Sequence, residues 1–379
     1  MRLKNILFTF LLILSFCLLD TSFIFAQADA SNQLPDLIPY RKGDKWGFCD
    51  RNKQIIIKCK YDFVYPFKEQ LAYVKLNHKV GFIDKEGNEI IPLKYDAADC
   101  FCEGFAKVEL NGNYGFVNNN GKEIIPLKYN IVLNFNEGFA AVSKNCKWGF
   151  IDQLGSEIIP CSFIGLYSFS EGLAAIQSSY YTTWGFIDKE GKIVIDFNYE
   201  NVVYFSEGFA RVEYQGKWGF IDKTGNEVIS LQYSKTHQFS ESFAAVQSSF
   251  NKTWGFIDKK GKQVIPFNYD DAGYFNEGLA PVQLKGSWGF IDKDGSEVIL
   301  FKYQYAYPFS DNLALVVLDN KCGYIDKMGI NVIPLKYDNT LLFLKGNQIL
   351  EMFYEGIALV TLEGKDGWID KEGIEYWEE

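Results

Sequence analysis

Residues 279–303 read LAPVQLKGSWGFIDKDGSEVILFKY, and this stretch decides the fold. It holds three short runs that favour β-strands, LAPV, WGFID and EVI. A polar turn joins the first two runs, and a D-K-x-G turn joins the second to the third. In that turn the Asp side chain accepts a hydrogen bond from the backbone two residues on, and the Gly supplies a positive φ. Short turns between short strands imply antiparallel pairing, so each unit is expected to be a three-stranded meander.

The same unit recurs ten times, and the spacing between its central glycines is mostly 34 residues. Six copies carry the Trp-Gly pair intact: Trp46-Gly47, Trp148-Gly149, Trp184-Gly185, Trp218-Gly219, Trp254-Gly255 and Trp288-Gly289. The other four keep the glycine alone: Gly81, Gly115, Gly323 and Gly367. The site therefore needs the glycine more strictly than the indole. Glycine inside a strand marks a bulge or a close approach, and we expect a neighbour's aromatic ring to lie over it, which makes the pair a packing device between neighbouring units.

The repeats extend over residues 37–377 as one domain, preceded by a short lead at residues 29–36. A connection of about a dozen residues, from K-Y-D to F-S-E-G, crosses to the next unit and can contribute a short fourth strand. The array opens with residues 37–40 in the first-strand position and closes with residues 375–377 in the third. Ten blades exceed the usual four to eight, and 34 residues is short for a four-stranded blade. An open curved superhelix is therefore slightly favoured, with a closed β-propeller-like ring as the alternative.

The first 28 residues have the pattern of a secretory signal peptide. A short positive start precedes an apolar run at residues 6–19, and the small-x-small sequence at residues 26–28 offers a cleavage site. The run is shorter than the roughly 20 residues of a membrane-spanning helix. We therefore expect an exported protein (periplasmic, cell-surface or secreted) with no transmembrane span after cleavage. The mature chain has 36 basic and 47 acidic residues, hence a net charge of −11 and no basic stripe to suit nucleic acid.

The units K-W-G-F-I-D-K-x-G-x-E-V-I-P and F-x-E-G-x-A-x-V resemble the WG-repeat (KWG-repeat) proteins of bacteria over almost the whole mature chain. The resemblance implies a β-rich repeat class that is often exported and has mostly undefined function. It implies no established active site and offers no catalytic residues. Copies without the tryptophan argue against a role that needs an indole in every repeat.

Recurring carboxylates are interpreted as turn residues. The Asp of W-G-F-I-D could bind Ca²⁺ through its oxygens, but it begins the D-K-x-G turn and is followed by Lys in seven of nine copies. The Glu-Gly pairs before the first strand have the spacing of a tight turn. His78 and His237 are the chain's two histidines, and neither is flanked by a nucleophile motif. We expect no catalytic residue, cofactor or metal site, and a hydrolase acting through carboxylates is the least favoured function.

Seven cysteines remain in the mature chain, and each stands at a position where other repeats carry another residue. An odd number leaves at least one unpaired. They are interpreted as small buried hydrophobes rather than a disulfide framework; they are Cys49, Cys59, Cys100, Cys102, Cys146, Cys161 and Cys322.

Binding is the expected function, because a repeat surface presents one side chain at regular intervals. The Trp of W-G-F is expected in the core, whereas the Tyr of K-Y-D is expected to be half exposed and to offer a ligand surface. That row comprises Tyr61, Tyr95, Tyr129, Tyr199, Tyr233, Tyr269, Tyr303 and Tyr337. The ligand surface is expected at six of them, Tyr95, Tyr129, Tyr199, Tyr269, Tyr303 and Tyr337. The loops at residues 178–183 and 248–253 and the 339–350 insertion depart from the framework, as binding loops do. We expect a non-enzymatic binding or scaffold protein of the cell envelope with a protein or glycan ligand; a purely structural envelope component is the alternative, and the oligomeric state stays open.

Overall fold

The computed structural model describes residues 34–178, 180, 182–339, 353 and 355–378. The predicted signal peptide and nearly all of the 339–350 insertion lie outside the described residues. Strands and turns make up the described chain, so the predicted all-β fold is confirmed. Within the same residues, no helix is long and apolar enough to cross a membrane.

Each repeat folds as one antiparallel sheet, as blade 6 shows. Its strands β20 (Asn201–Ser206), β21 (Phe209–Tyr214), β22 (Lys217–Asp222) and β23 (Glu227–Tyr233) pair in chain order. The predicted three-stranded meander is β21 to β23. The crossing segment supplies the fourth strand, which is only two residues long in six of the blades. Because the crossing segment itself forms this strand, 34 residues suffice for a four-stranded blade.

The strands of the other blades follow the same order. Blades 1 to 3 contain β1 (Ile38–Lys42), β2 (Lys45–Cys49), β3 (Ile55–Tyr61); β4 (Phe63–Lys68), β5 (Leu71–Leu76), β6 (Lys79–Ile83), β7 (Glu89–Tyr95); β8 (Ala97–Ala98), β9 (Phe105–Leu110), β10 (Asn113–Asn118) and β11 (Glu123–Tyr129). Blades 4 and 5 contain β12 (Ile131–Val132), β13 (Phe139–Lys144), β14 (Lys147–Asp152), β15 (Glu157–Phe163); β16 (Gly165–Leu166), β17 (Ala174–Gln177), β18 (Trp184–Ile187) and β19 (Ile193–Tyr199). Blades 7 and 8 contain β24 (Lys235–Thr236), β25 (Phe243–Gln247), β26 (Trp254–Asp258), β27 (Gln263–Tyr269); β28 (Asp271–Ala272), β29 (Ala280–Leu284), β30 (Ser287–Ile291) and β31 (Glu297–Tyr303). Blades 9 and 10 contain β32 (Tyr305–Ala306), β33 (Ala314–Leu318), β34 (Lys321–Ile325), β35 (Asn331–Asp338); β36 (Ile357–Leu362) and β37 (Lys365–Asp370), and β38 (Trp377–Glu378) ends the described chain.

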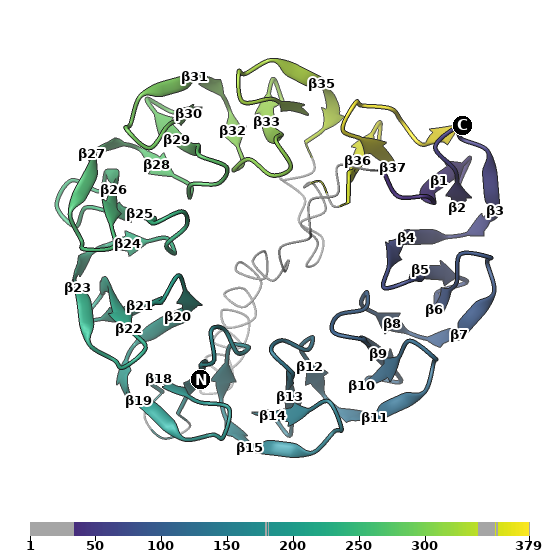
Figure 1. Ribbon diagram of the computed structural model, residues 1–379, viewed down its shortest axis with the longest axis horizontal. Helices are drawn as coiled ribbons and strands as arrows, with labels where there is room; N and C mark the ends of the chain where they lie inside the picture. The colour runs from purple at the N-terminus through teal and green to yellow at the C-terminus, as the bar shows by residue number, and fades with distance from the viewer. Residues whose placement is uncertain (1–33, 179, 181, 340–352, 354, 379) are drawn as a thin grey trace, which may run out of the picture.

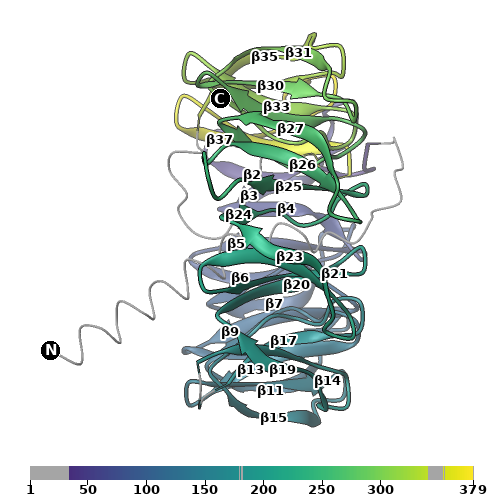
Figure 2. The ribbon, with the colours of Figure 1, turned by 90° about the vertical axis from the view of Figure 1, so that its left-hand side faces the viewer.

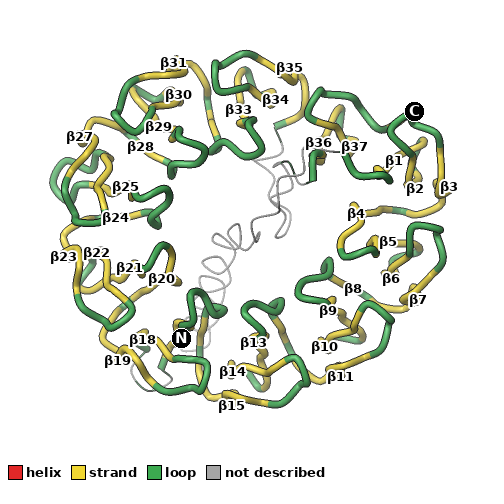
Figure 3. The backbone as a smooth tube through the Cα atoms, in the orientation of Figure 1, coloured by secondary structure: helices red, strands yellow, loops and turns green. Residues whose placement is uncertain are grey.

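The ten sheets stand side by side in a closed ring (Figure 1). Strands β3, β7, β11, β15, β19, β23, β27, β31 and β35 lie at the outer rim (Figure 1), and the edge-on view shows strands crossing the thickness of the ring (Figure 2). Loops therefore collect at two ends of the blades (Figure 3). We call one end the hairpin face; it carries the turns between the second and third strands of the four-stranded blades, such as the turn between β21 and β22. The opposite end, with the F-x-E-G and D-K-x-G turns, is the staple face.

Ring closure is made by the end of the chain, so the favoured open superhelix is wrong and the closed-ring alternative is confirmed. Glu375 keeps the third-strand position of blade 10, where it bridges Ile369. The chain then crosses to blade 1, and β38 pairs in parallel with β1, joining Arg41 to Trp377. An ion pair of 2.6 Å joins Lys42 to Glu378 beside it. This contact pairs the edge of β1 that an open array would leave unpaired.

The central glycine leaves room for the outer strand of its own blade. The prediction that an aromatic ring of a neighbouring unit lies over it is therefore wrong for nine of the ten repeats. A Cβ on Gly219 would lie 2.5 Å from the carbonyl oxygen of Ile229 and 2.9 Å from the amide nitrogen of Leu231, both backbone atoms of β23. The register shifts at this point, which marks a β-bulge. The bulge brings the outer strand against the glycine. Gly367 is the exception, because the ring of Trp377 covers it.

Packing between blades is done by phenylalanine rather than by the Trp-Gly pair. The Phe of W-G-F meets the Phe of the next blade's F-x-E-G turn; Phe220 and Phe239, for example, have ring centroids 4.8 Å apart. Nine such pairs run around the ring, with Tyr324 and Phe353 forming the last. The tilted and edge-on arrangements are those that aromatic rings prefer. The predicted core position of the tryptophan is confirmed for four copies, Trp46, Trp184, Trp254 and Trp288, while Trp148 and Trp218 are half-buried.

Candidate functional site

The tyrosine row does not form a ligand surface. Six of the eight side chains are buried: Tyr61, Tyr95, Tyr129, Tyr233, Tyr303 and Tyr337; Tyr199 and Tyr269 are half-buried. The bulge explains this, because it sets the tyrosine at the end of the outer strand opposite the Trp-Gly position. A lysine covers the ring in several copies, as Lys94 does with its Nζ 4.9 Å from the ring centre of Tyr95. The Tyr95 hydroxyl donates to Glu123 of the next blade at 3.2 Å.

The recurring aspartate makes the turn that the sequence predicts. In blade 6, one carboxylate oxygen of Asp222 accepts hydrogen bonds from the backbone N–H groups of Thr224 and Asn226, both at 2.9 Å. The Thr224 hydroxyl also donates to it, and these bonds lower the pKa of Asp222 to about 2. An oxygen that already accepts three donors is a poor ligand for a cation. The described residues contain no group of three or more His, Cys, Asp or Glu placed to hold a metal ion.

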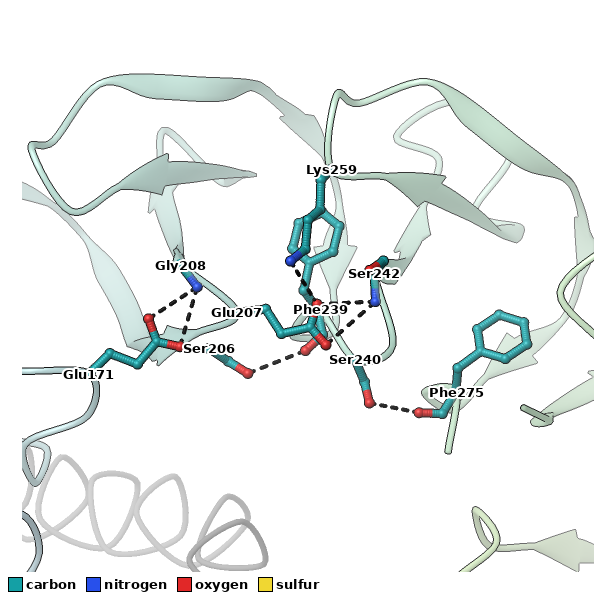
Figure 4. Close-up of polar contacts among 9 residues, drawn as sticks. All are labelled: Glu171, Ser206, Glu207, Gly208, Phe239, Ser240, Ser242, Lys259 and Phe275. Atoms are coloured by element: carbon teal, nitrogen blue, oxygen red, sulfur yellow. Dashed lines mark hydrogen bonds and ion pairs between the residues drawn. The ribbon is translucent and has the colours of Figure 1, made fainter. Parts of the chain in front are cut away.

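The glutamate of F-x-E-G links neighbouring blades. Glu207 of blade 6 accepts a hydrogen bond from the backbone N–H of Ser242 in blade 7 at 3.1 Å (Figure 4). It also forms an ion pair of 3.0 Å with Lys259, the lysine of the D-K-x-G turn of the same neighbouring blade. We call this three-residue contact a staple. Its members come from the two kinds of turn that lie together on the staple face.

The staple repeats around the ring. Its hydrogen bond joins Glu69 to Gly104, Glu103 to Gly138, Glu137 to Gly172, Glu171 to Gly208, Glu207 to Ser242, Glu241 to Gly278 and Glu277 to Asn312. A second rung runs beside it, in which Ser206 donates to the carbonyl oxygen of Phe239 and Ser240 donates to that of Phe275 (Figure 4). All seven carboxylates accept a backbone N–H of the adjacent blade, and five of them also pair with its D-K-x-G lysine. The structure therefore assigns them to assembly of the ring, beyond the local turn role expected from the sequence.

Histidine 237 is a packing residue. It is half-buried, and its ring stacks on Trp254 with centroids 5.0 Å apart. Burial, reinforced by the charges of Arg211 and Lys235, lowers its pKa to about 3. The ring therefore stays neutral at physiological pH and packs against the indole.

The seven cysteines of the described residues are free thiols. Cys49 and Cys322 are buried as expected, and burial raises the pKa of Cys49 to about 12. The other five depart from the expectation. Cys59, Cys100, Cys102 and Cys161 are half-buried, and Cys146 is exposed in a tight turn of the hairpin face with a φ of 61°.

Two matching loops on the hairpin face carry exposed aromatic side chains. Phe250 is 98% exposed and Tyr180 is 87% exposed, and each occupies the third position of its loop, in blade 7 and blade 5 respectively. The sequence singled out these loops by their extra length but did not single out the two rings. The signal was present, since residues 248–253 read SSFNKT and residues 178–183 read SSYYTT, with large aromatic residues among small polar ones.

The backbone of each loop is held by the same bonds. The Ser248 amide donates to the Thr253 carbonyl at 2.9 Å, and the Phe250 amide donates to the Ser248 hydroxyl at 3.2 Å. In blade 5, the Tyr180 amide donates to the Ser178 hydroxyl at 3.1 Å. Below the loops, Gln247 donates to the Lys252 carbonyl and Gln177 to the Thr182 carbonyl. The two aromatic rings are therefore displayed on loops held by the same described bonds, on the same face and with one blade between them.

Comparison with known proteins gives the family and the fold. The profile of the family described as "WG containing repeat" matches nine segments, residues 46–79, 81–114, 114–148, 148–179, 184–218, 218–248, 254–287, 288–322 and 323–365. No curated protein matches the chain. A solved structure of a eukaryotic initiation factor is 12% identical with a TM-score of 0.54, over 77% of this chain and 93% of that one, which indicates a shared fold alone. Kluyveromyces lactis Hsv2 is 11% identical with a TM-score of 0.37, over 62% of this chain and 87% of that one. Nine matched repeats tile residues 46–365, and the chain belongs to the WG-repeat family.

Proposed function

We propose that this chain is an exported, non-enzymatic binding or scaffold protein of the cell envelope, and that its ligand, a glycan or a protein, is held on the hairpin face. The observation that carries the proposal is the pair of exposed aromatic rings, Phe250 and Tyr180. Exposing a whole phenylalanine to water brings no benefit to folding, whereas aromatic rings stack on sugar rings and grip peptide side chains. The export part of the proposal rests on the N-terminal sequence.

The anchoring of the loops supports binding by a preformed site. Each loop is closed by its own serine and by a glutamine beneath it. Little ordering entropy is then lost when a ligand arrives, which favours affinity. The recurring carboxylates support a non-enzymatic function in a different way, because the Asp turns and the Glu staples already use their oxygens within the fold.

A glycan array and an envelope-protein pull-down, both with residues 29–379, test the proposal. The variant Phe250→Ser with Tyr180→Ser should lose at least tenfold in binding to any ligand found. The matched control is Leu154→Ser with Met328→Ser, which removes two apolar side chains that are 83% and 75% exposed from the staple face and should bind normally. Failure to bind any glycan or envelope protein, or equal binding by both variants, would count against the proposal. The first of these results would favour a purely structural role.

A further inference from the structure

A third exposed aromatic ring lies on the hairpin face between Tyr180 and Phe250. Tyr214 is the last residue of β21, where that strand enters its hairpin turn, and it is 50% exposed. Its blade stands between the blades that carry the other two rings, and the three blades are neighbours in the ring (Figure 1). Blades 5, 6 and 7 therefore each present one aromatic side chain from the turn between the second and third strands. We call these three side chains the aromatic row.

The other blades have no aromatic ring at this place. In the described strands that enter the equivalent turn, the residue at the position of Tyr214 is Leu or Lys: Lys42, Leu76, Leu110, Lys144, Leu284, Leu318 and Leu362. The two-residue turns that follow them contain no Phe, Tyr or Trp either. The five leucines are half-buried, whereas Tyr214 is exposed. The aromatic row is therefore a property of three adjacent blades and not of the repeat.

The turns that carry the aromatic row are polar and nearly uncharged. They read QSSYYTTW at residues 177–184, YQGKW at residues 214–218 and QSSFNKTW at residues 247–254. They contain no carboxylate, although the mature chain is strongly acidic, and their charged residues are Lys217 and Lys252. Most of the other side chains are amides and hydroxyls, which both donate and accept hydrogen bonds. A charged ligand would meet few opposite charges here, so the composition favours an uncharged ligand rich in hydroxyl groups.

We infer that the ligand is a linear, uncharged polysaccharide that crosses blades 5 to 7 and stacks a sugar ring on each of Tyr180, Tyr214 and Phe250, an assignment that rests on the binding function proposed above. Rings that stand out from the surface offer a flat apolar face for stacking. The anchors of a protein interface, in contrast, cluster near its centre in well-packed pockets, surrounded by residues that exclude water. One ring per blade along a curved surface suits a polymer with a regular repeat.

Three contacts in a row make the affinity depend on the length of the sugar chain. An oligosaccharide too short to reach a second ring makes one contact, whereas a longer one makes the next contact as an intramolecular step. The affinity should therefore rise with chain length and level off once all three rings are covered. Tyr214→Leu removes the middle contact. Five other blades hold Leu at this position, so the fold should accept the change.

Affinity electrophoresis of residues 29–379 tests the inference, in native gels that contain dextran, galactomannan, mixed-linkage β-glucan or, as an anionic comparison, alginate. At least one uncharged polysaccharide should retard the wild type, and alginate should not. Tyr214→Leu should raise the dissociation constant roughly fivefold or more, whereas Tyr214→Phe, which keeps the ring, should change it less than about twofold. Calorimetric titration with oligosaccharides of the retarding polymer measures the dependence on chain length. The matched control is Leu110→Ala, at the same position in blade 3, which should bind as the wild type does, and circular dichroism checks that each variant is folded.

The outcomes separate this inference from the proposed function. An envelope protein that is retained by the wild type and lost by Phe250→Ser with Tyr180→Ser, without binding to any uncharged glycan in the gels or on the array, would overturn the inference and leave the proposed function standing. So would polysaccharide binding that Tyr214→Leu leaves unchanged or that does not strengthen with chain length. Retardation by alginate alone would overturn the inference as well. Absence of any ligand would count against both.

Discussion

Replacing Gly219 by alanine should destabilise the ring far more than an ordinary glycine substitution. The new Cβ would sit 2.5 Å from the Ile229 carbonyl oxygen and 2.9 Å from the Leu231 amide nitrogen. An ordinary contact to that oxygen is roughly 0.8 Å longer, and neither backbone atom can swing away as a side-chain end could. The outer strand must retreat, which costs packing strain of about 1–3 kcal/mol and about 1 kcal/mol for each hydrogen bond lost from the bulge. We expect a total of about 3–5 kcal/mol.

Gly208→Ala is the matched control in the same blade. Gly208 has a φ of +88° but nothing within 4 Å of its would-be Cβ. The chain itself places Gln70, Ser242 and Asn312 at the equivalent position with positive φ. Alanine there should cost only about 1–2 kcal/mol, from the left-handed conformation.

Urea denaturation followed by intrinsic fluorescence and by far-UV circular dichroism measures both variants. Because a repeat array can unfold in parts, coincidence of the two probes must be checked before free energies are compared. If Gly219→Ala were no more destabilising than Gly208→Ala, the close backbone approach would not be what fixes the glycine. Gly367 gives an internal comparison, since the atom in the way belongs to the Trp377 ring. Trp377→Leu should therefore restore part of the stability that Gly367→Ala loses. A double-mutant cycle should show that the two changes in unfolding free energy are not additive.

Three further predictions follow from the buried and paired groups. Glu207→Ala should cost about 1–3 kcal/mol of stability, because it leaves the Ser242 N–H without its charged acceptor. Lys259→Ala should cost at most about 1 kcal/mol, because Lys259 is a half-exposed ion-pair partner. Equal losses of the two variants in urea denaturation would contradict this order. The folded-state pKa of His237 is about 3 against 6.5 for an unperturbed histidine, so its contribution to stability is complete above pH 6.5 and is lost as pH falls toward 3. The wild type should lose about 2 kcal/mol between pH 7 and pH 5 through this group, and His237→Tyr, which copies Tyr65 of blade 2, should lose less over the same interval; parallel pH profiles would refute the assignment. A thiol reagent at pH 8 should label one cysteine quickly in the native protein, and Cys146→Ser should abolish that fast phase. The reason is that Cys146 is the exposed thiol among the described residues, while burial raises the pKa of Cys49 to about 12. An unchanged fast phase would show that another thiol is the accessible one.

Local features were predictable from the sequence because they depend on a few adjacent residues. The D-K-x-G turn, with Asp222 accepting from the backbone and Gly225 at positive φ, follows from side-chain chemistry within five residues. The strand runs and their antiparallel order follow from turn length. The family resemblance, confirmed by nine matched repeats, rests on the same repeated local pattern.

Features that depend on contacts between repeats were not predictable in the same way. The glycine was correctly identified as the fixed member of Trp-Gly, but the group pressed against it is the backbone of β23, which a bulge brings there and which carries no side-chain signature. The tyrosine row was expected to be half exposed, yet the same bulge directs its side chains toward the interface between blades. The Glu207 staple joins a turn to the N–H of Ser242, 35 residues away, and spacing alone does not show which groups meet across two blades.

The sequence by itself determined an all-β chain of ten repeats with strictly required glycines, because local propensity, turn chemistry and repetition are written in the residues of each unit. Only the tertiary structure decided that the array closes into a ring. Closure depends on the small angle between successive blades, summed ten times, and on whether the last strand then reaches the first. The pairing of β38 with β1 is the outcome of that sum, and no single repeat contains it.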